Sequence, residues 1–191
     1  MRLALFGGTF DPVHDAHLAI ARAAADRFGL DRVLIVPAAH PPHKALATHA
    51  SYGDRVRMAQ LACADEPRFE VSLLEENTPR SYSIDTIDKV RVEMDAESDL
   101  FFIIGADAFA EIQTWRRWRD VARAVGFLVI GRPGHDYEVP AGVRIERLDT
   151  LELRISSSEI RAALTEGRKP AGIPGPVLEY IFERGLYGAR R

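Results

Sequence analysis

The chain has 191 residues, enough for a sizeable core, and we expect residues 1–191 to form one domain. Hydrophobic residues make up 47% and charged residues 28%, as in soluble globular proteins. The formal net charge of −3 argues against nucleic acid or an anionic membrane as a partner. Cys63 is the single cysteine, which excludes an internal disulfide and a metal site built from several cysteines.

No stretch of the sequence is predicted to cross a membrane or to target the chain for secretion. The N-terminus is apolar for only a few residues before Gly7 and Gly8, and no run of about 18 apolar residues occurs anywhere. We therefore expect a cytoplasmic protein. The sequence leaves open whether it is a monomer or a homodimer.

Short apolar runs alternate with helical patterns along the chain. In chain order, the sequence predicts a strand at 2–7, a helix at 14–29, a strand at 32–37, a Pro-rich loop at 38–50, a helix at 52–64, a strand at 68–75, a helix at 83–94, strands at 99–107 and 126–134 on either side of a helix at 115–125, a strand at 143–149, and closing helices at 157–167 and 176–186. Gly29 is placed to end the first helix, and Ser51 with Asp54 resembles a capping box for the second.

This alternation predicts an α/β fold with a mainly parallel sheet covered by helices on both faces. In such sheets, ligands bind at the carboxyl ends of the strands, where the winding direction switches. The residues suited to chemistry follow the predicted strands, which agrees with this expectation.

The stretch from Leu3 to His17 runs from a strand through a glycine pair into a helix. Gly7 and Gly8 allow the backbone to approach a ligand closely, and the N-terminus of the helix favours phosphate. The stretch is neither the dinucleotide-binding pattern G-x-G-x-x-G nor a P-loop. His14 and His17 share one helix face, so both imidazoles can point at one group.

Two other interpretations of the histidines remain open at this point. The glycines could form only a tight turn beside solvated histidines. Alternatively, the histidines could bind zinc, which needs three or four ligands, with His40, His43 and His49 as possible further ligands.

A second pattern, "ISSSEIR" at 155–161, opens a helix with serines. The serines from Ser156 to Ser158 can cap this helix, and Arg161 lies one turn further, on the side of Ser157 or Ser158. Hydroxyls, N–H groups and a guanidinium together suit a polyphosphate, although a capped surface helix has the same pattern.

Taken together, "GGTFDPVHDAH" (7–17) and "ISSSEIR" resemble the signatures of the H-x-G-H nucleotidyltransferases, and within them the nicotinate-nucleotide adenylyltransferase family. Ala16 stands where this family usually has Gly, and Ser158 where it has Thr. The resemblance extends from Gly7 to Tyr187. It implies a Rossmann-like, doubly wound fold, with the C-terminal helices at about 157–187 part of the same domain.

The middle of the chain carries further segments that resemble this family. "PAAHPPHK" (37–44) ends in Lys44, which the resemblance places near phosphate groups. "SYSIDT" (81–86) implies that Thr86 lies where the pyridine carboxylate meets backbone donors and that Ser83 also binds the nicotinate nucleotide, although an ordinary helix cap would have the same pattern. In "IIGADAF" (103–109), Gly105 would admit a flat ring and Asp107 would accept hydrogen bonds from ribose. In "TWRRW" (114–118), Trp115 would stack on the pyridine ring.

The resemblance implies transfer of AMP from ATP to nicotinate mononucleotide, giving nicotinate adenine dinucleotide and pyrophosphate in NAD biosynthesis. Positioning and charge stabilisation would carry the reaction. The implied catalytic residues are His17, which donates to the α-phosphate, together with His14, Lys44 and Arg161. Mg²⁺ would be held chiefly by ATP, with no metal site made by the protein.

The implied binding residues form two sets. ATP would contact Gly7, Gly8, Thr9, Phe10, His14, His17, Gly105, Asp107, Ile155, Ser156, Ser157, Ser158 and Arg161. The nicotinate nucleotide would contact Gly8, Thr9, Lys44, Ser83, Thr86 and Trp115. The alternatives are nicotinamide mononucleotide or a phosphopantetheine-type acceptor, a zinc-dependent hydrolase, and a nucleotide-binding module without activity.

Overall fold

The computed structural model describes residues 1–41, 48–131, 137–149 and 155–190. The strands are β1 (Arg2–Gly8), β2 (Arg32–Pro37), β3 (Phe69–Val71), β4 (Asp99–Gly105), β5 (Gly126–Gly131) and β6 (Ile145–Asp149). The α-helices are α1 (Asp15–Phe28), α2 (Tyr52–Cys63), α3 (Ser83–Glu93), α4 (Ala106–Ala110), α5 (Trp118–Ala124), α6 (Ser157–Thr165) and α7 (Gly175–Arg184), with short 3₁₀ helices η1 (Ile112–Thr114) and η2 (Leu186–Gly188).

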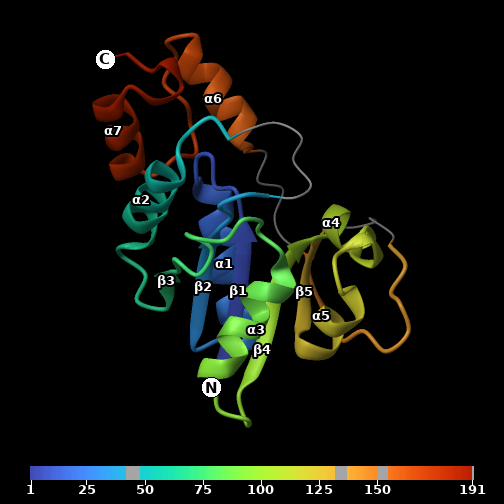
Figure 1. Cartoon of the computed structure of the whole chain (residues 1–191). Helices are drawn as coiled ribbons and strands as arrows, with labels where there is room; N and C mark the ends of the chain where they lie inside the picture. Colours follow the sequence, from blue (N-terminus) through green and yellow to red (C-terminus); the bar gives the residue numbers. More distant parts are fainter. Residues whose placement is uncertain (42–47, 132–136, 150–154, 191) are drawn as a thin grey trace.

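The strands form one parallel sheet in the order β3-β2-β1-β4-β5-β6. Helix α3 lies across one face of the sheet and α1 lies behind it, so the sheet is covered on both sides (Figure 1). The predicted doubly wound α/β fold is confirmed. The strand order reverses between β1 and β4, so a crevice for ligands is expected at the carboxyl ends of these two strands.

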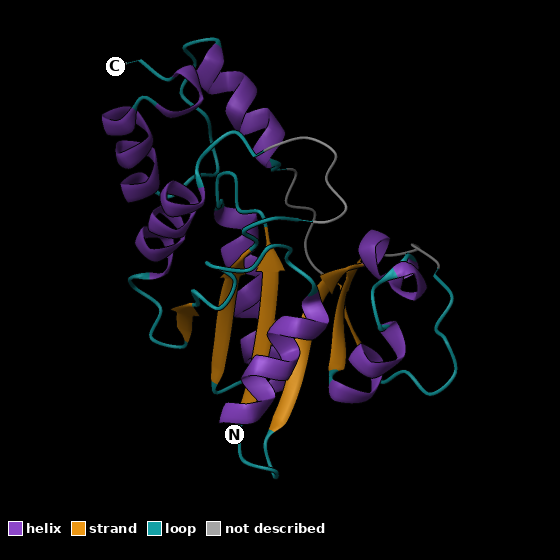
Figure 2. Ribbon diagram, viewed as in Figure 1, coloured by secondary structure: helices purple, strands orange, loops and turns teal. Residues whose placement is uncertain are grey.

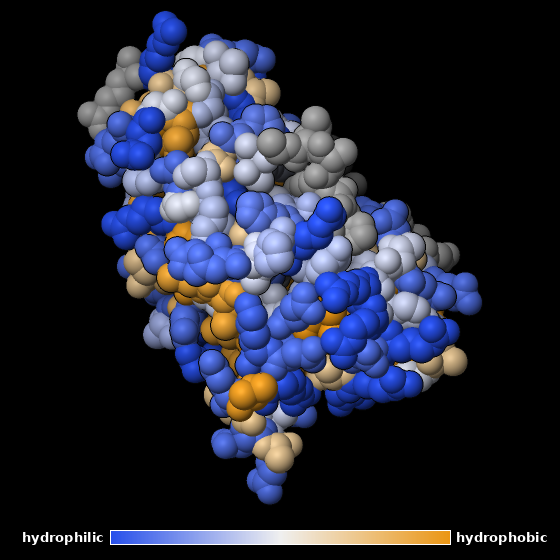
Figure 3. Space-filling view, viewed as in Figure 1, coloured by the Kyte–Doolittle hydropathy of each residue, from blue (hydrophilic) through white to orange (hydrophobic). Residues whose placement is uncertain are grey.

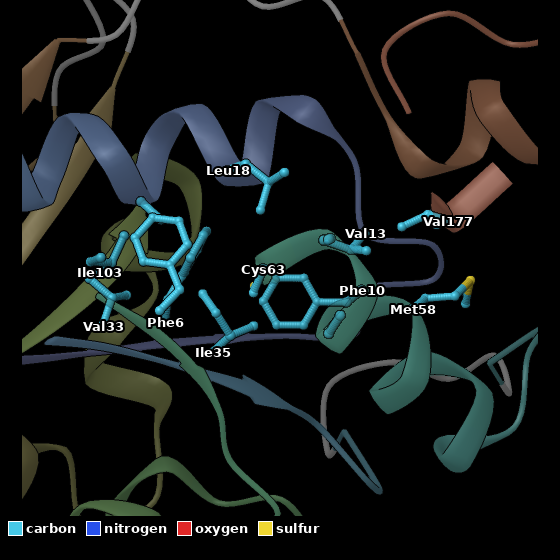
Figure 4. Close-up of a cluster of buried hydrophobic side chains, with 14 of the residues drawn as sticks. Phe6, Phe10, Val13, Leu18, Val33, Ile35, Met58, Cys63, Ile103 and Val177 are labelled. Atoms are coloured by element: carbon cyan, nitrogen blue, oxygen red, sulfur yellow. The ribbon is translucent and has the colours of Figure 1, made fainter. Parts of the chain in front are cut away.

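Alternate residues of β1 enter two separate hydrophobic clusters. Ala4 and Phe6 belong to the cluster that also includes residues of α1, α2 and α7, whereas Leu3 and Leu5 belong to the cluster under α3 and α5. Side chains alternate between the two faces of a strand, so the residues from Leu3 to Phe6 are all apolar because both faces of this central strand are buried there. Figure 4 shows the first cluster, with Phe10 among its labelled members.

Most helix ends follow the signals in the sequence. Gly29 adopts the left-handed conformation that ends α1, with φ of 56°. The Ser51 hydroxyl accepts a hydrogen bond from the backbone N–H of Asp54 over 3.1 Å and so caps α2. The serine-capped start of the helix at 157 is also confirmed, because the Ser156 hydroxyl accepts from the backbone N–H of Glu159.

Three predicted elements are wrong in their bounds. The strand predicted at 99–107 ends at Gly105, and Asp107 lies in the short helix α4 instead. The helix predicted at 115–125 begins at Trp118, because Arg117 has a positive φ of 52° that a helix cannot continue through. The strand predicted at 68–75 is reduced to β3, an edge strand of three residues that pairs only with β2.

The strand predicted at 143–149 begins later than expected, at Ile145. The strand predicted at 126–134 is described from Gly126 to Gly131, and its residues 132–134 lie outside the described residues. Both still lie beside each other in parallel at the end of the sheet, as Figure 2 shows.

The surface shows few large hydrophobic side chains. Val92, Met1 and Leu73 are among those exposed, and the face in Figure 3 is largely hydrophilic. Across the described residues, no helix combines the length and the apolar character needed to span a bilayer.

Candidate active site

A pocket of about 390 Å³ opens at the carboxyl ends of β1, β2 and β4, where the strand order reverses. Residues expected to bind ligand meet there from four separate segments of the chain. The expected residues that line it are Gly7, Gly8, Thr9, His17, Ser83, Thr86, Gly105 and Trp115. The fold thus brings one set of predicted residues together in a pocket large enough for a small molecule.

Residues 7–14, which join the end of β1 to α1 and are called the glycine loop below, contain the buried residue Phe10. This residue is buried and has a positive φ of 48°, which is rare for a bulky side chain. Its ring lies so close to Gly8 that a Cβ at that position would be 3.0 Å from the Phe10 ring. Packing against Phe10 therefore favours glycine at position 8, and Phe10 is a core residue that does not line the pocket.

His14 and His17 stack, with ring centroids 3.7 Å apart and planes inclined by 26°. His17 lines the pocket, and its Nδ1 accepts a hydrogen bond from the backbone N–H of His14 over 3.2 Å. That bond places the ring proton of neutral His17 on Nε2, so this nitrogen is the donor.

His14 occupies a different environment from His17. It is 5% exposed, and its Nδ1 has no hydrogen-bond partner among the described residues. Burial lowers the pKa of His14 to about 4, so the ring is neutral at pH 7. His14 therefore stacks on the ring of His17 as a buried, neutral neighbour, and it does not line the pocket.

The serine and arginine residues of α6 lie beside the glycine loop. The guanidinium of Arg161 donates to the backbone carbonyl of Asp11 over 2.7 Å and to the Ser158 hydroxyl over 3.2 Å. Ser157 donates to the carbonyl of Pro12 over 2.9 Å. Ser158 and Arg161 line a second, more open hollow together with His49 and Tyr187. Arg161 thus shares a side with Ser158, as predicted, and also holds the loop that precedes α1.

The carboxylate of Asp11 is the centre of this arrangement. It is 4% exposed and accepts hydrogen bonds from the backbone N–H groups of His49 and Ala50 and from the hydroxyl of Tyr187. Burial by itself raises the pKa of Asp11, but these three hydrogen bonds and the charge of Arg161 hold the pKa below its ordinary value. One carboxylate therefore joins the glycine loop, the start of α2 and the C-terminal segment.

Arg55 also binds a backbone carbonyl of the glycine loop. Its side chain is fully buried, and its guanidinium donates to the carbonyl of Thr9 over 2.7 Å. The two arginines therefore bind the backbone carbonyls on either side of Phe10.

Thr86 is buried, and its hydroxyl donates to Glu75 Oε1 over 2.8 Å. Glu75 also lines the pocket and is 6% exposed, and its Oε2 has no partner among the described residues. Trp115 is half-buried and packs edge-on against Phe102 at 5.8 Å between ring centroids, so one side of the indole is held by the core.

The remaining predicted residues lie in several places. Gly105 is exposed at the end of β4, and a Cβ there would meet nothing within 4 Å. Asp107 is exposed on α4 and Ile155 packs against the first cluster, while Ser156 is occupied with capping α6. Lys44 and His43 lie outside the described residues. Within those residues, no group of three or more His, Cys, Asp or Glu side chains could hold a metal ion.

Comparison with known proteins identifies the family of this chain. A family model described as Cytidylyltransferase-like matches residues 5–163. A probable nicotinate-nucleotide adenylyltransferase from Solibacter usitatus (strain Ellin6076) is 65% identical over 98% of this chain and 100% of its own length. The chain belongs to the nicotinate-nucleotide adenylyltransferase family. A probable member from Thermus thermophilus is 42% identical over 98% of this chain and all of its own length.

Solved structures agree with this family in fold. The nicotinic acid mononucleotide adenylyltransferase of Plasmodium falciparum, complexed with NaAD, superposes with a TM-score of 0.80 over 98% of this chain and 97% of that chain. Its sequence identity to this chain is 19%, so the comparison supports the fold alone. The predicted family is confirmed, and the doubly wound sheet is shared with this distant structure.

Sequence reasoning missed several residues in or beside this candidate site, namely Asp11 with its several partners, Arg55, Glu75, Arg116 and Tyr187. Only Arg55 could have been recognised from the sequence. Met58, Ala59 and Ala62 follow it at the helical spacings of three, four and seven residues, so Arg55 shares the buried, apolar face of α2 with them. A charged residue on an apolar helix face indicates a buried partner. The other residues meet the site only through the tertiary fold.

Proposed function

We propose that this chain transfers AMP from ATP to nicotinate mononucleotide, giving nicotinate adenine dinucleotide and pyrophosphate, as a step in NAD biosynthesis. One observation carries the proposal: the end-to-end identity of 65% with a protein of that name. The pocket at the strand-order reversal supports it, because His17, Gly105 and Trp115 line one continuous cavity.

The reaction needs little covalent help from the protein. The phosphate monoester of the acceptor is ionised near pH 7, and one of its oxygens forms the new bond to the α-phosphorus of ATP. The bond from that phosphorus to the bridging oxygen breaks, and pyrophosphate leaves with the electron pair. The chain therefore has to align the two substrates and stabilise charge on the phosphate oxygens.

His17 is the donor best placed for this role. Its Nδ1 is occupied by the backbone N–H of His14, so Nε2 carries the proton that can bond a phosphate oxygen. Buried, neutral His14 fixes the ring from beneath. Arg161 would add a cation near the leaving phosphates, because within the described residues its hydrogen bonds to Asp11 and Ser158 use two of its five N–H donors. Lys44 is proposed as a further cation on the basis of the sequence.

Mg²⁺ is proposed to enter with ATP as part of the substrate. The described residues offer no cluster of carboxylates and histidines that would hold the ion by themselves. We expect activity to require Mg²⁺ and EDTA to abolish it. The melting temperature of the ligand-free protein should stay unchanged, because no structural metal would be removed.

Pyrophosphate release provides the test. Purified protein with ATP, Mg²⁺ and nicotinate mononucleotide should release pyrophosphate and form the dinucleotide, and nicotinamide mononucleotide should be a poorer acceptor. Turnover of phosphopantetheine alone, or hydrolysis without an acceptor, would contradict the proposal. We propose that the protein is either a monomer or a homodimer, and sedimentation of the same sample would distinguish the two.

For an ATP-consuming biosynthetic enzyme, we propose a cytoplasmic location.

A further inference from the structure

The pocket has an uneven distribution of charge. Among its described lining residues, Arg116 is the one with a permanent positive charge, and Glu75 is the one carboxylate. Glu75 is buried, and one of its oxygens is unpartnered among the described residues. A second carboxylate entering the same pocket would be repelled by Glu75 unless a cation faced it.

Arg116 lies next to Trp115 at the edge of this pocket. Its guanidinium carbon is 4.7 Å from the centroid of the Tyr82 ring, and Nη1 is 3.6 Å from Oδ2 of Asp85. Tyr82 precedes α3 and Asp85 lies in its first turn, so the guanidinium stands over the N-terminus of this helix. Both the guanidinium and the helix N-terminus contribute positive potential at the same place.

The contacts that hold Arg116 are weak enough to be exchanged. The side chains of Arg116 and Asp85 are 52% and 41% exposed, and an ion pair of this kind contributes little to stability in water. The ring of Tyr82 supports the planar guanidinium without using its N–H donors. Arg116 can therefore bond an incoming carboxylate while it stays on the ring.

We propose that Arg116 is a specificity-determining residue that selects an acceptor with a carboxylate on its aromatic ring over one with a carboxamide. This inference rests on the proposed function and names the group that reads the substrate. A guanidinium offers N–H donors only, which match the two acceptor oxygens of a carboxylate. A carboxamide presents one acceptor and one NH₂ group, and the NH₂ group would face another donor.

The same segment supplies a matched control. Arg119 also lies over an aromatic ring, with its guanidinium carbon 4.6 Å from the ring of Trp118, but it does not line the pocket. Arg116→Gln and Arg119→Gln therefore remove the same charge and the same type of ring contact. Only the first removes a cation from the pocket.

The experiment compares both acceptors at saturating ATP. Arg116→Gln should lower kcat/KM for nicotinate mononucleotide about 10- to 100-fold, chiefly through KM, because a charge-assisted hydrogen bond is lost. The value for nicotinamide mononucleotide should change by less than about threefold, since the carboxamide gains little from the charge. Arg116→Lys should recover part of the loss, and Arg119→Gln should behave like the wild type. Asp85→Asn removes the competing carboxylate and should not weaken binding of the nicotinate substrate.

Equal losses with both acceptors would overturn the inference, because Arg116 would then only support Tyr82 and Trp115. An unchanged preference in Arg116→Gln would overturn it too. If the wild type turns over neither acceptor, the proposed function fails instead. In that case, calorimetry can still measure how tightly nicotinate mononucleotide binds to the wild type and to Arg116→Gln. Equal dissociation constants for the two proteins would overturn the proposed role of Arg116.

Discussion

The hydroxyl of Tyr187 donates to Oδ1 of Asp11 over 2.7 Å, across 176 residues of sequence. Tyr187 has a positive φ of 58°. Phe10, which precedes Asp11 in the chain, has a positive φ of 48°. Non-glycine residues in this region are strained and persist only where the surrounding structure holds them. The contact therefore ties two strained segments together, one of them the glycine loop of the site.

Tyr187→Phe tests whether this hydrogen bond positions the glycine loop for ATP in addition to stabilising the fold. Loss of a hydrogen bond to a buried carboxylate should cost about 1.5–3 kcal/mol of unfolding free energy. The glycine loop should loosen, so that KM for ATP rises. The control is Tyr180→Phe, because Tyr180 donates to Asp54 over 2.8 Å in a similar bond away from the loop. Equal effects on KM in the two variants would count against a positioning role.

The pH dependence of stability gives a second measurement on the same bond. The pKa of Asp11 lies below its ordinary value because hydrogen bonds outweigh burial. Its stabilising contribution is thus present above the unfolded pKa of about 4 and is lost as the pH falls through the folded value. In urea unfolding, the gap between wild type and Tyr187→Phe should be full at pH 7 and should shrink below about pH 4. A gap that widens on acidification would contradict this.

His17→Ala should lower kcat far more than it changes KM. The lost donor would act on charge at the α-phosphate, and removal of such a donor costs on the order of 10² to 10³ in kcat. The readout is pyrophosphate release at saturating substrates. His40→Ala, a change at an exposed histidine that does not line the pocket, is the control. A kcat within twofold of the wild type would rule out this role for His17.

Gly105→Ala tests whether a ligand approaches the end of β4. Its φ of −71° suits alanine, and a new Cβ would meet nothing within 4 Å, so the melting temperature should not fall. If a flat ring lies against Gly105, the methyl group should raise KM for the corresponding substrate several-fold. A variant with unchanged kinetics for both substrates would show that no ligand contacts this position.

Stability should fall between pH 6.5 and 4 because of His14. Burial lowers the pKa of His14 to about 4, and the unfolded value is about 6.5. The neutral ring therefore stabilises the fold fully above pH 6.5, and this contribution is lost as the pH falls toward 4. Between pH 7 and pH 5, the wild type should lose about 1–2 kcal/mol more than His14→Gln. A stability curve of His14→Gln that runs parallel to that of the wild type over this pH range would be the contrary result.

Ala16→Gly examines the departure from the family signature. Ala16 is buried in the first turn of α1, and glycine there should cost up to about 1 kcal/mol of stability. We expect a slightly lower KM for ATP and an almost unchanged kcat. Ala19→Gly, in the same helix, controls for helix propensity. A rise in kcat by orders of magnitude would instead mark the natural chain as an impaired enzyme.

The sequence by itself determined the parts that depend on local chemistry. The continuous apolar run of β1, the cap at Ser51 and the left-handed Gly29 follow from short-range patterns, because burial on both faces and backbone conformation leave direct marks on residue type. The family signatures located Gly8 and His17. These two residues do reach the pocket.

Only the tertiary structure decided how distant residues share one site. Asp11 meets Tyr187, and Arg116 enters the pocket, because the sheet brings strand ends and the C-terminal segment together. The left-handed backbone at Arg117 also displaced the predicted start of α5. Hydrogen bonds and charges between segments far apart in the chain have no periodicity for a sequence pattern to record. Their partners are fixed only when the strands have taken their order.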